Sequence, residues 1–166
     1  MKTGLFSVLA FCAWVSFASG CAKRTLDGNL IGASGTGNVQ EIRRLLTLGA
    51  NVNCREGSLV KATPLISAMF ECQDEAALVL LAAGADPNIP DGRGKMPLFY
   101  ALMPGNHSAV IRALVAAGAQ TSEYAPMFLD LPKDDVNRVA FEEAVAERAR
   151  RGAHSQAAER NGARDQ

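Results

Sequence analysis

Apolar residues in the middle of the chain recur at the three- and four-residue spacing that is typical of amphipathic helices. Three such segments stand out, and a glycine follows each of them. Glycine adopts the left-handed conformation at little cost, so it is a common stop signal just past a helix. The sequence therefore predicts three helices that end in the same way. Their apolar positions and closing glycines are Ile42, Leu45, Leu46 and Gly49; Ala77, Leu80, Leu81 and Gly84; and Ile111, Leu114, Val115 and Gly118.

The three segments belong to a longer unit that repeats along the chain. The phrases LLTLGANVN, LLAAGADPN and LVAAGAQTS occupy residues 45–53, 80–88 and 114–122. A fixed period in the mid-thirties indicates a stacked repeat in which each unit is one pair of helices. A further helix is expected before each segment, separated from it by a short turn. The alanines of these first helices and the turns after them are Ala33 with GTGN, Ala68 with ECQD and Ala101 with PGNH.

The second and third units resemble the ankyrin repeat. The second contains TPLISA, residues 63–68, against the family's T-P-L-H-x-A. The third contains DGRGKMPLFYA, residues 91–101, which keeps the family's hairpin Asp and Gly and the Pro-Leu of its first helix. In TPLISA, the threonine is expected to cap a helix and the proline to occupy its first position. The resemblance covers about residues 28–122 and implies an all-α solenoid of three repeats joined by β-hairpin-like loops.

The chain departs from the family pattern at three places. Gly28 and Asn29 stand where the first unit would have Thr-Pro, as an edge repeat allows. The loop 53–63 is two residues longer than the loop 88–96, and Cys72 replaces a turn glycine. Because three repeats are close to the minimum for a stable stack, the ends need caps.

Residues 123–152 are expected to cap the stack with a helix. The segment PKDDVNRVAFEEAVAERARRG begins with acidic residues and ends with arginines before Gly152, an order that matches the helix dipole. An incomplete fourth repeat that includes MFLDL, residues 127–131, describes the segment equally well. The polar, aperiodic residues 153–166 are expected to be disordered. The apolar stripe expected on the helix is Val136, Val139, Ala140, Ala144 and Val145.

Residues 1–20 have the composition of a secretory signal peptide. One lysine precedes an apolar run, residues 5–17, which is shorter than a membrane span. The segment continues into ASGC, residues 18–21, which resembles a bacterial lipobox, whose cysteine is diacylated and becomes the mature N-terminus. The resemblance implies that Cys21 carries lipid and that residues 21–27 form a short tether.

By the same resemblance, Ala22 favours the outer membrane as the site of anchoring. The lipobox pattern prefers leucine where this chain has Ala18. Ala18 and Gly20 also satisfy the small-x-small rule of ordinary signal peptidase, which would give a soluble periplasmic or secreted protein.

Composition and charge argue against several classes of function. Lys+Arg and Asp+Glu both total 17, so the net charge is zero, unlike that of most nucleic-acid-binding proteins. His107 in an inter-helix turn and His154 in the tail are expected to be solvated, because a catalytic histidine needs an oriented partner in a cleft. The glycine-rich stretch 32–38 lacks the Lys-Ser/Thr of a phosphate loop. We therefore expect no catalytic residues, no metal and no cofactor.

Cys54 and Cys72 are expected to be separate thiols. The repeat pattern places Cys54 at the start of a hairpin loop and Cys72 in the turn at the opposite end of the helices. A helix of roughly ten residues spans ~15 Å, whereas a disulfide needs Cα atoms within about 7 Å. A disulfide remains the alternative, because the loop after Cys54 is long.

The resemblance also implies which face binds a partner, because ankyrin proteins are usually contacted at the hairpin tips and the exposed side of the first helix. Exposed Phe and Met beside charges are typical of interface centres. Phe99 fits a core position as well as a contact, whereas Phe70 and Met103 favour contact and are expected to be neighbours. The basic hairpin residues indicate an acidic patch on the partner. The expected partner-binding residues are Arg55, Glu56, Lys61, Phe70, Glu71, Arg93, Lys95, Phe99, Met103 and Pro104.

Together these patterns favour a monomeric protein-binding module, tethered in the periplasm and without enzymatic activity. Small lipobox-bearing ankyrin proteins include immunity proteins, so the resemblance implies a protein that neutralises a secreted antibacterial effector such as a phospholipase. An accessory protein that supports a periplasmic enzyme, for example a catalase, belongs to the same class. The other class is an envelope scaffold, or a hydrolase that uses Cys54 or Cys72, although neither histidine is placed to activate a cysteine.

Overall fold

The computed structural model describes residues 24–55, 57 and 59–162, and every regular element within them is a helix. The order of these helices matches the predicted pairs, and a further helix pair follows the third unit. The helices are 24–35, α2 (Val39–Thr47), α3 (Pro64–Phe70), α4 (Asp74–Ala82), α5 (Pro97–Tyr100), α6 (Ser108–Ala116), α7 (Ala125–Leu129) and α8 (Val136–Gly162).

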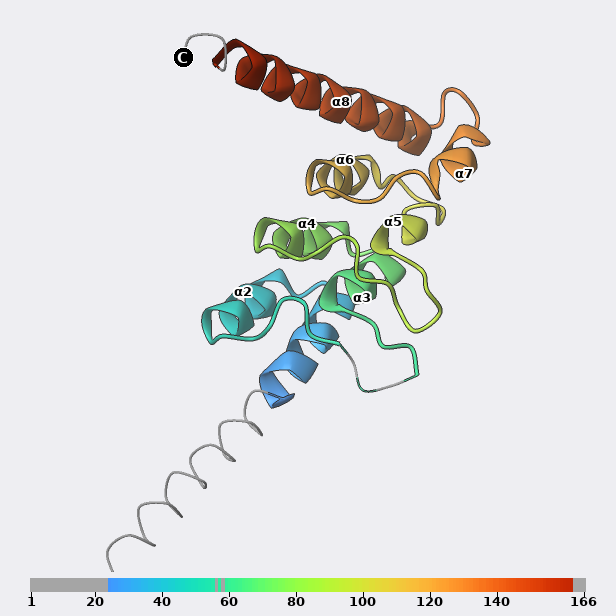
Figure 1. The fold of residues 1–166 in the computed structure, drawn as a ribbon. Coiled ribbons are helices and arrows are strands. Elements are labelled where there is room, and N and C mark those ends of the chain that lie inside the picture. The colour runs from blue at the N-terminus through green and yellow to red at the C-terminus, as the bar shows by residue number, and fades with distance from the viewer. Residues whose placement is uncertain (1–23, 56, 58, 163–166) are drawn as a thin grey trace, which may run out of the picture.

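The helix pairs stack into a solenoid in which first and second helices form two rows (Figure 1). The first helices, 24–35, α3, α5 and α7, form one row, and α2, α4, α6 and α8 form the other. Within the second row, α4 packs on α2, α6 on α4 and α8 on α6. The loops that join successive pairs project from the stack and provide one wall of the candidate site.

Local sequence signals start and stop the helices as predicted. Thr63 accepts a hydrogen bond from the backbone N–H of Ile66, 3.2 Å away, and Pro64 occupies the first position of α3. The backbone φ angles of Gly49, Gly84 and Gly118 are +89°, +89° and +96°. In this left-handed region a residue with a Cβ is strained, which explains the repeated glycine. The helix-stop prediction is therefore confirmed.

The core lies between the two rows and is built from the repeated leucines and alanines. Leu45, Leu80 and Leu114 have at most 1% of their surface exposed. Ala68 in α3 and Ala101, which directly follows α5, are fully buried. Their small side chains let neighbouring first helices approach each other closely, so the stack follows directly from the repeated alanine position.

A hydrogen bond joins the second unit to the first, and another joins the third unit to the second, at equivalent positions. In each, a backbone N–H just past the glycine stop donates to an Asn side chain of the preceding unit over 2.8 Å. The donors are Asp86 and Gln120, and the acceptors are Asn53 and Asn88 respectively. We call these two bonds the inter-repeat ladder. In the first unit, the equivalent N–H of Asn51 donates instead to Asp27 of that unit's own first helix, also over 2.8 Å.

The C-terminal helix buries a different face from the one that was predicted. Val136 is 50% exposed and Val139 is 37% exposed, so the stripe that includes them is wrong at these two positions. Asn137 and Phe141 are buried instead, on either side of the correctly predicted Ala140. The reason is tertiary, because the Phe141 ring stacks on Phe128 of α7 at 4.4 Å and thereby sets the rotation of α8.

α8 also extends beyond its predicted end. Gly152 does not stop the helix, which continues to Gly162, so the predicted helix end at Gly152 is wrong. A glycine inside a helix costs only about 1 kcal/mol relative to alanine, and the residues that follow are mostly good helix formers without proline.

Candidate protein-binding site

The projecting loops and the first helices meet at an angle, and we call the space between them the concave groove. At one end it opens among the helix 24–35, the loop after α2 and α3, with a volume of about 1020 Å³. Further along it narrows to a pocket of about 200 Å³ between α3, α5 and two loops. Ser67 lines both parts, so they adjoin. Among the predicted partner-binding residues, Arg55 and Glu71 line the wide part and Phe70 and Arg93 line the pocket.

Phe70 is the exposed aromatic side chain of this groove. It ends α3, and 53% of its surface is exposed. Its ring meets the ring of Tyr100, from the next repeat, edge to face at a centroid distance of 5.9 Å. The ring is thus held on one side and open to a partner on the other. The expectation that Phe70 neighbours Met103 stays a prediction, and the contact that the structure records is with Tyr100.

Tyr100 was missed by the sequence interpretation, and it fixes the hairpin that carries Arg93. Its hydroxyl donates to the Asp91 carboxylate at 2.7 Å, and the same carboxylate accepts the backbone N–H groups of Arg93 and Lys95. Burial alone would raise the pKa of Asp91, but these hydrogen bonds outweigh burial and hold it below its usual range. Burial, and next the hydrogen bond to Asp91, raises the pKa of Tyr100 to about 12.

The long loop after Cys54 is fastened to the next hairpin rather than hanging free. Arg55 donates from its guanidinium to the carbonyl oxygen of Pro90, 2.5 Å away. Gly92 donates its N–H to the carbonyl oxygen of Val60 at 2.6 Å. Lys61 is exposed and has a φ of +46°, which is unusual for a residue with a side chain. These contacts hold the loop along the concave groove.

The remaining predicted partner-binding residues divide between the surface and the core. The Lys95 ammonium lies over the Phe99 ring, 4.6 Å from its centroid. Phe99 is half-buried between Tyr100 and Tyr124, and its role in partner contact stays a prediction. Met103 is partly buried against the core, and Pro104 is exposed. Glu56 and the predicted lipidation site Cys21 lie outside the described residues.

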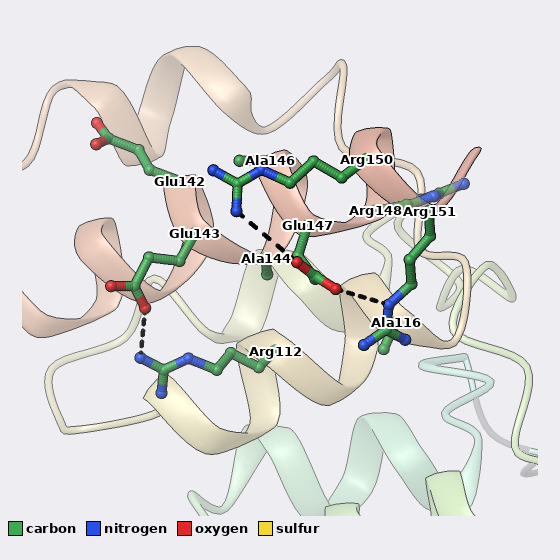
Figure 2. A pocket seen from close by; sticks show the side chains of 10 residues that line it. All are labelled: Arg112, Ala116, Glu142, Glu143, Ala144, Ala146, Glu147, Arg148, Arg150 and Arg151. Carbon is green, nitrogen blue, oxygen red and sulfur yellow. Dashed lines mark hydrogen bonds and ion pairs between the residues drawn. The ribbon is translucent and has the colours of Figure 1, made fainter. Parts of the chain in front are cut away.

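A second depression of about 750 Å³ lies between α6 and α8. Figure 2 shows Glu143 directed at Arg112 and Glu147 directed at both Arg150 and Arg151. The N–O distances are 2.9 Å, 4.0 Å and 2.9 Å respectively. Three of the lining arginines already have carboxylate partners, and Arg148 donates to the carbonyl oxygen of Ala119. Because no aromatic side chain lines this depression either, it is a weaker candidate for protein binding than the concave groove.

His107 is buried, which corrects the prediction that it is solvated. Only 3% of its surface is exposed, and its Nδ1 lies 2.7 Å from an Asp74 carboxylate oxygen. Its backbone N–H donates to Asn137 at the start of α8. Nε2 lies under Gly105, where a Cβ would come within 2.8 Å, and it has no partner among the described residues. The His107 side chain is closed off from solvent, whereas the Asp74 side chain is 29% exposed, and the pair links two successive repeats.

The two described cysteines are free, as the repeat geometry suggested. Cys54 is buried and Cys72 is exposed. Burial, and then the negative charge of Asp27, raises the pKa of the Cys54 thiol to about 12. A nucleophilic cysteine needs the opposite shift, so the environment of Cys54 argues against the hydrolase hypothesis.

The described residues contain neither a metal-binding cluster nor a membrane-spanning helix. No three His, Cys, Asp or Glu side chains in them gather where they could hold a metal ion. Within the same residues, no helix combines the length and the apolar character that crossing a membrane requires.

Comparison with known proteins agrees with the geometry. Residues 65–115 match the profile of the family described as ankyrin repeats (many copies). The stacked helix pairs, the projecting loops and this match define an all-α ankyrin-repeat fold. Proteins of this class generally act as interaction modules without enzymatic activity and bind other proteins.

Curated relatives share the repeat similarity over a small part of their length. The chain is 31% identical over 140 residues to ARF GTPase-activating protein GIT1 of Mus musculus, which covers 82% of this chain and 18% of that protein. It is 46% identical over 65 residues to mitochondrial disaggregase of Bos taurus, which covers 39% of this chain and 9% of that protein. The chain therefore spans less than a fifth of either relative, and the activities in their names belong to those proteins.

Proposed function

We propose that this protein is a periplasmic binding module that neutralises a secreted antibacterial effector, such as a phospholipase, by holding it in the concave groove. The proposal that the protein binds a partner rests on the placement of Phe70. Its aromatic ring is half-exposed and lines the same pocket as the exposed Arg93. Aromatic and arginine side chains are the residues that most often anchor protein interfaces.

The neutralising role is supported by the sequence of the leader. The signal-like segment and ASGC at residues 18–21 resemble those of lipobox-bearing immunity proteins. Lipid on Cys21 would tether the groove to the outer membrane, within reach of an effector that acts on the envelope. The bound protein would then inhibit the effector by covering part of its surface. A stable interface of standard size buries about 1,600 Å², which is enough to block access to an active site.

The binding test is a double variant with a matched control. Phe70→Ala with Arg93→Ala should weaken binding to the effector encoded by a neighbouring gene at least about tenfold, since each interface anchor contributes about 2 kcal/mol. Protection of cells that express the effector in the periplasm should fall in parallel. Arg43→Ala on α2, in the second row of helices, should leave both the binding and the protection unchanged.

The result that would contradict the interface is loss of binding in Arg43→Ala with normal binding in the double variant. The neutralising role would be wrong if the wild-type protein neither bound nor protected against any effector encoded by a neighbouring gene.

Membrane anchoring is tested separately: Cys21→Ser should abolish acyl labelling and release the protein into the soluble periplasm. Wild-type protein that already fractionates as soluble would contradict the lipobox.

A further inference from the structure

The longer loop of the second repeat presents an apolar lip to solvent. Leu59 is 94% exposed and Val60 is 40% exposed. Single exposed apolar residues are common on protein surfaces. These two differ because Val60 lines the same pocket as the half-exposed Phe70, so the lip and the pocket form one apolar surface.

Contacts with the next repeat set the position of this lip. A Cβ at Gly92 would come within 2.1 Å of the Leu59 carbonyl oxygen and 3.0 Å of the Val60 carbonyl oxygen. Only glycine therefore allows the two loops to lie this close. The Gly92 hydrogen bond to Val60 and the Arg55 hydrogen bond to Pro90 keep the two loops in contact. A fixed side chain loses less conformational entropy on binding than one on a free loop.

The pocket behind the lip has the size and lining for one large apolar side chain. Its volume is about 200 Å³, whereas an apolar cavity of about 150 Å³ already accommodates benzene. Val60, Ile66, Phe70 and Tyr100 provide aliphatic and aromatic walls. The Tyr100 hydroxyl is directed to Asp91, so the tyrosine contributes its ring to the pocket.

Charge at the rim of the pocket indicates the character of the partner. Arg93 lines the pocket and is exposed. Its charge acts on the nearby Asp91, but no salt bridge joins it to a carboxylate among the described residues. The nearby carboxylate of Asp91 is buried and accepts three hydrogen bonds. Lys61 adds a second exposed cation on the lip. An arginine in this position favours a carboxylate, which its planar guanidinium can bind through two hydrogen bonds.

We infer that the lip and the pocket together bind a protruding protein segment in which one large apolar side chain is flanked by carboxylates. The apolar side chain fills the space between Val60, Phe70 and Tyr100, and a carboxylate pairs with Arg93. Leu59 contacts the partner beyond the pocket and is a specificity-determining residue for this interface. This inference rests on the proposed protein-binding function for its biological setting, but the pocket is testable alone.

The first test uses synthetic peptides and the protein purified after export. The probe is the nonapeptide Gly-Ser-Asp-Asp-Phe-Asp-Asp-Ser-Gly, with one control that has lysine for every aspartate and another that has serine for phenylalanine. Amide NMR titration should show saturable shifts near Val60, Phe70 and Arg93 with the probe. Both control peptides should bind at least about tenfold more weakly, as expected when an anchor or its charge partner is lost. Equal binding of the lysine peptide, or shifts confined to the α6–α8 depression, would overturn the inference.

The second test compares Leu59 with a matched exposed leucine, Leu48, which lines neither part of the concave groove. Leu48 closes α2 and is 54% exposed, so Leu59→Ser and Leu48→Ser remove similar side chains from the surface. Both should leave the melting temperature unchanged. Leu59→Ser should weaken binding of the effector about tenfold and Leu48→Ser less than about twofold.

The two proposals fail in different ways. If the acidic peptide binds as expected but no effector does, the neutralising function is wrong and the pocket stands. If an effector binds and neither Leu59→Ser nor Arg93→Ala changes its affinity, the pocket inference is wrong and the neutralising function stands.

Discussion

Removing the hydroxyl of Tyr100 tests how the concave groove is built. Tyr100→Phe keeps the ring that contacts Phe70 but removes the 2.7 Å hydrogen bond to the buried Asp91 carboxylate. A hydrogen bond to a charged group contributes about 1.5–3 kcal/mol. Because Asp91 keeps the N–H groups of Arg93 and Lys95, we expect a loss near the lower end, about 2 kcal/mol in the free energy of unfolding.

The expected loss depends on pH with a defined sign. The pKa of Asp91 is lowered in the folded protein, so its ionised form stabilises the fold above the unfolded pKa of about 3.9. That contribution disappears as the pH falls through the folded pKa. The difference between wild type and Tyr100→Phe should therefore be complete at pH 7 and shrink below about pH 4.

Urea denaturation followed by circular dichroism measures both quantities. Tyr124→Phe is the matched control, because the Tyr124 hydroxyl accepts the neutral backbone N–H of Met96 at 3.2 Å. It should cost about 1 kcal/mol, and that cost should not change between pH 7 and pH 3. A Tyr100→Phe loss under about 0.5 kcal/mol at pH 7, or one as constant with pH as that of the control, would refute the assigned role of Asp91.

Three further predictions follow from burial. His107→Ala should lower the free energy of unfolding, measured by urea denaturation, by about 2 kcal/mol, because it removes buried contacts and the partner of Asp74. A loss of less than about 0.5 kcal/mol would be expected of a solvated histidine and would contradict the buried one. Leu80→Asp should unfold the stack, because an unpaired carboxylate at this fully buried position costs several kcal/mol, and an unchanged melt by circular dichroism would contradict the core. At pH 8, iodoacetamide should label the exposed Cys72 and leave Cys54 unmodified until the protein is denatured; equal labelling of both in the native protein would contradict the buried thiol.

Local signals made most of the fold predictable from the sequence. The Thr63 cap and the glycine stops act within a few residues, so their effect is visible without knowledge of the tertiary structure. His107 was misjudged because its partners Asp74 and Asn137 lie 33 and 30 residues away in the chain. A polar residue in a turn looks solvated unless the next repeat is known to cover it.

The candidate site was only partly predictable for the same reason. Phe70 and Arg93 were found from repeat position, and the structure brings them to one pocket. Tyr100 was missed because its position within a helix gives no sign that its hydroxyl reaches Asp91. The hairpin aspartate was the available signal, since a carboxylate in a tight hairpin needs hydrogen-bond donors and a tyrosine hydroxyl nearby in the sequence can provide one. The rotation of α8 depends on Phe128, so its helical pattern alone did not determine it.

The inter-repeat ladder has a consequence for how such a protein changes length. Each bond links one unit only to the unit before it, through the same positions, as in Asp86 to Asn53 and Gln120 to Asn88. An in-frame tandem duplication of residues 54–88 would therefore add one more junction of the existing kind and leave the others intact. Gene duplication can thus lengthen the groove without redesigning the core, so the size of the recognised target can evolve separately from the stability of the scaffold.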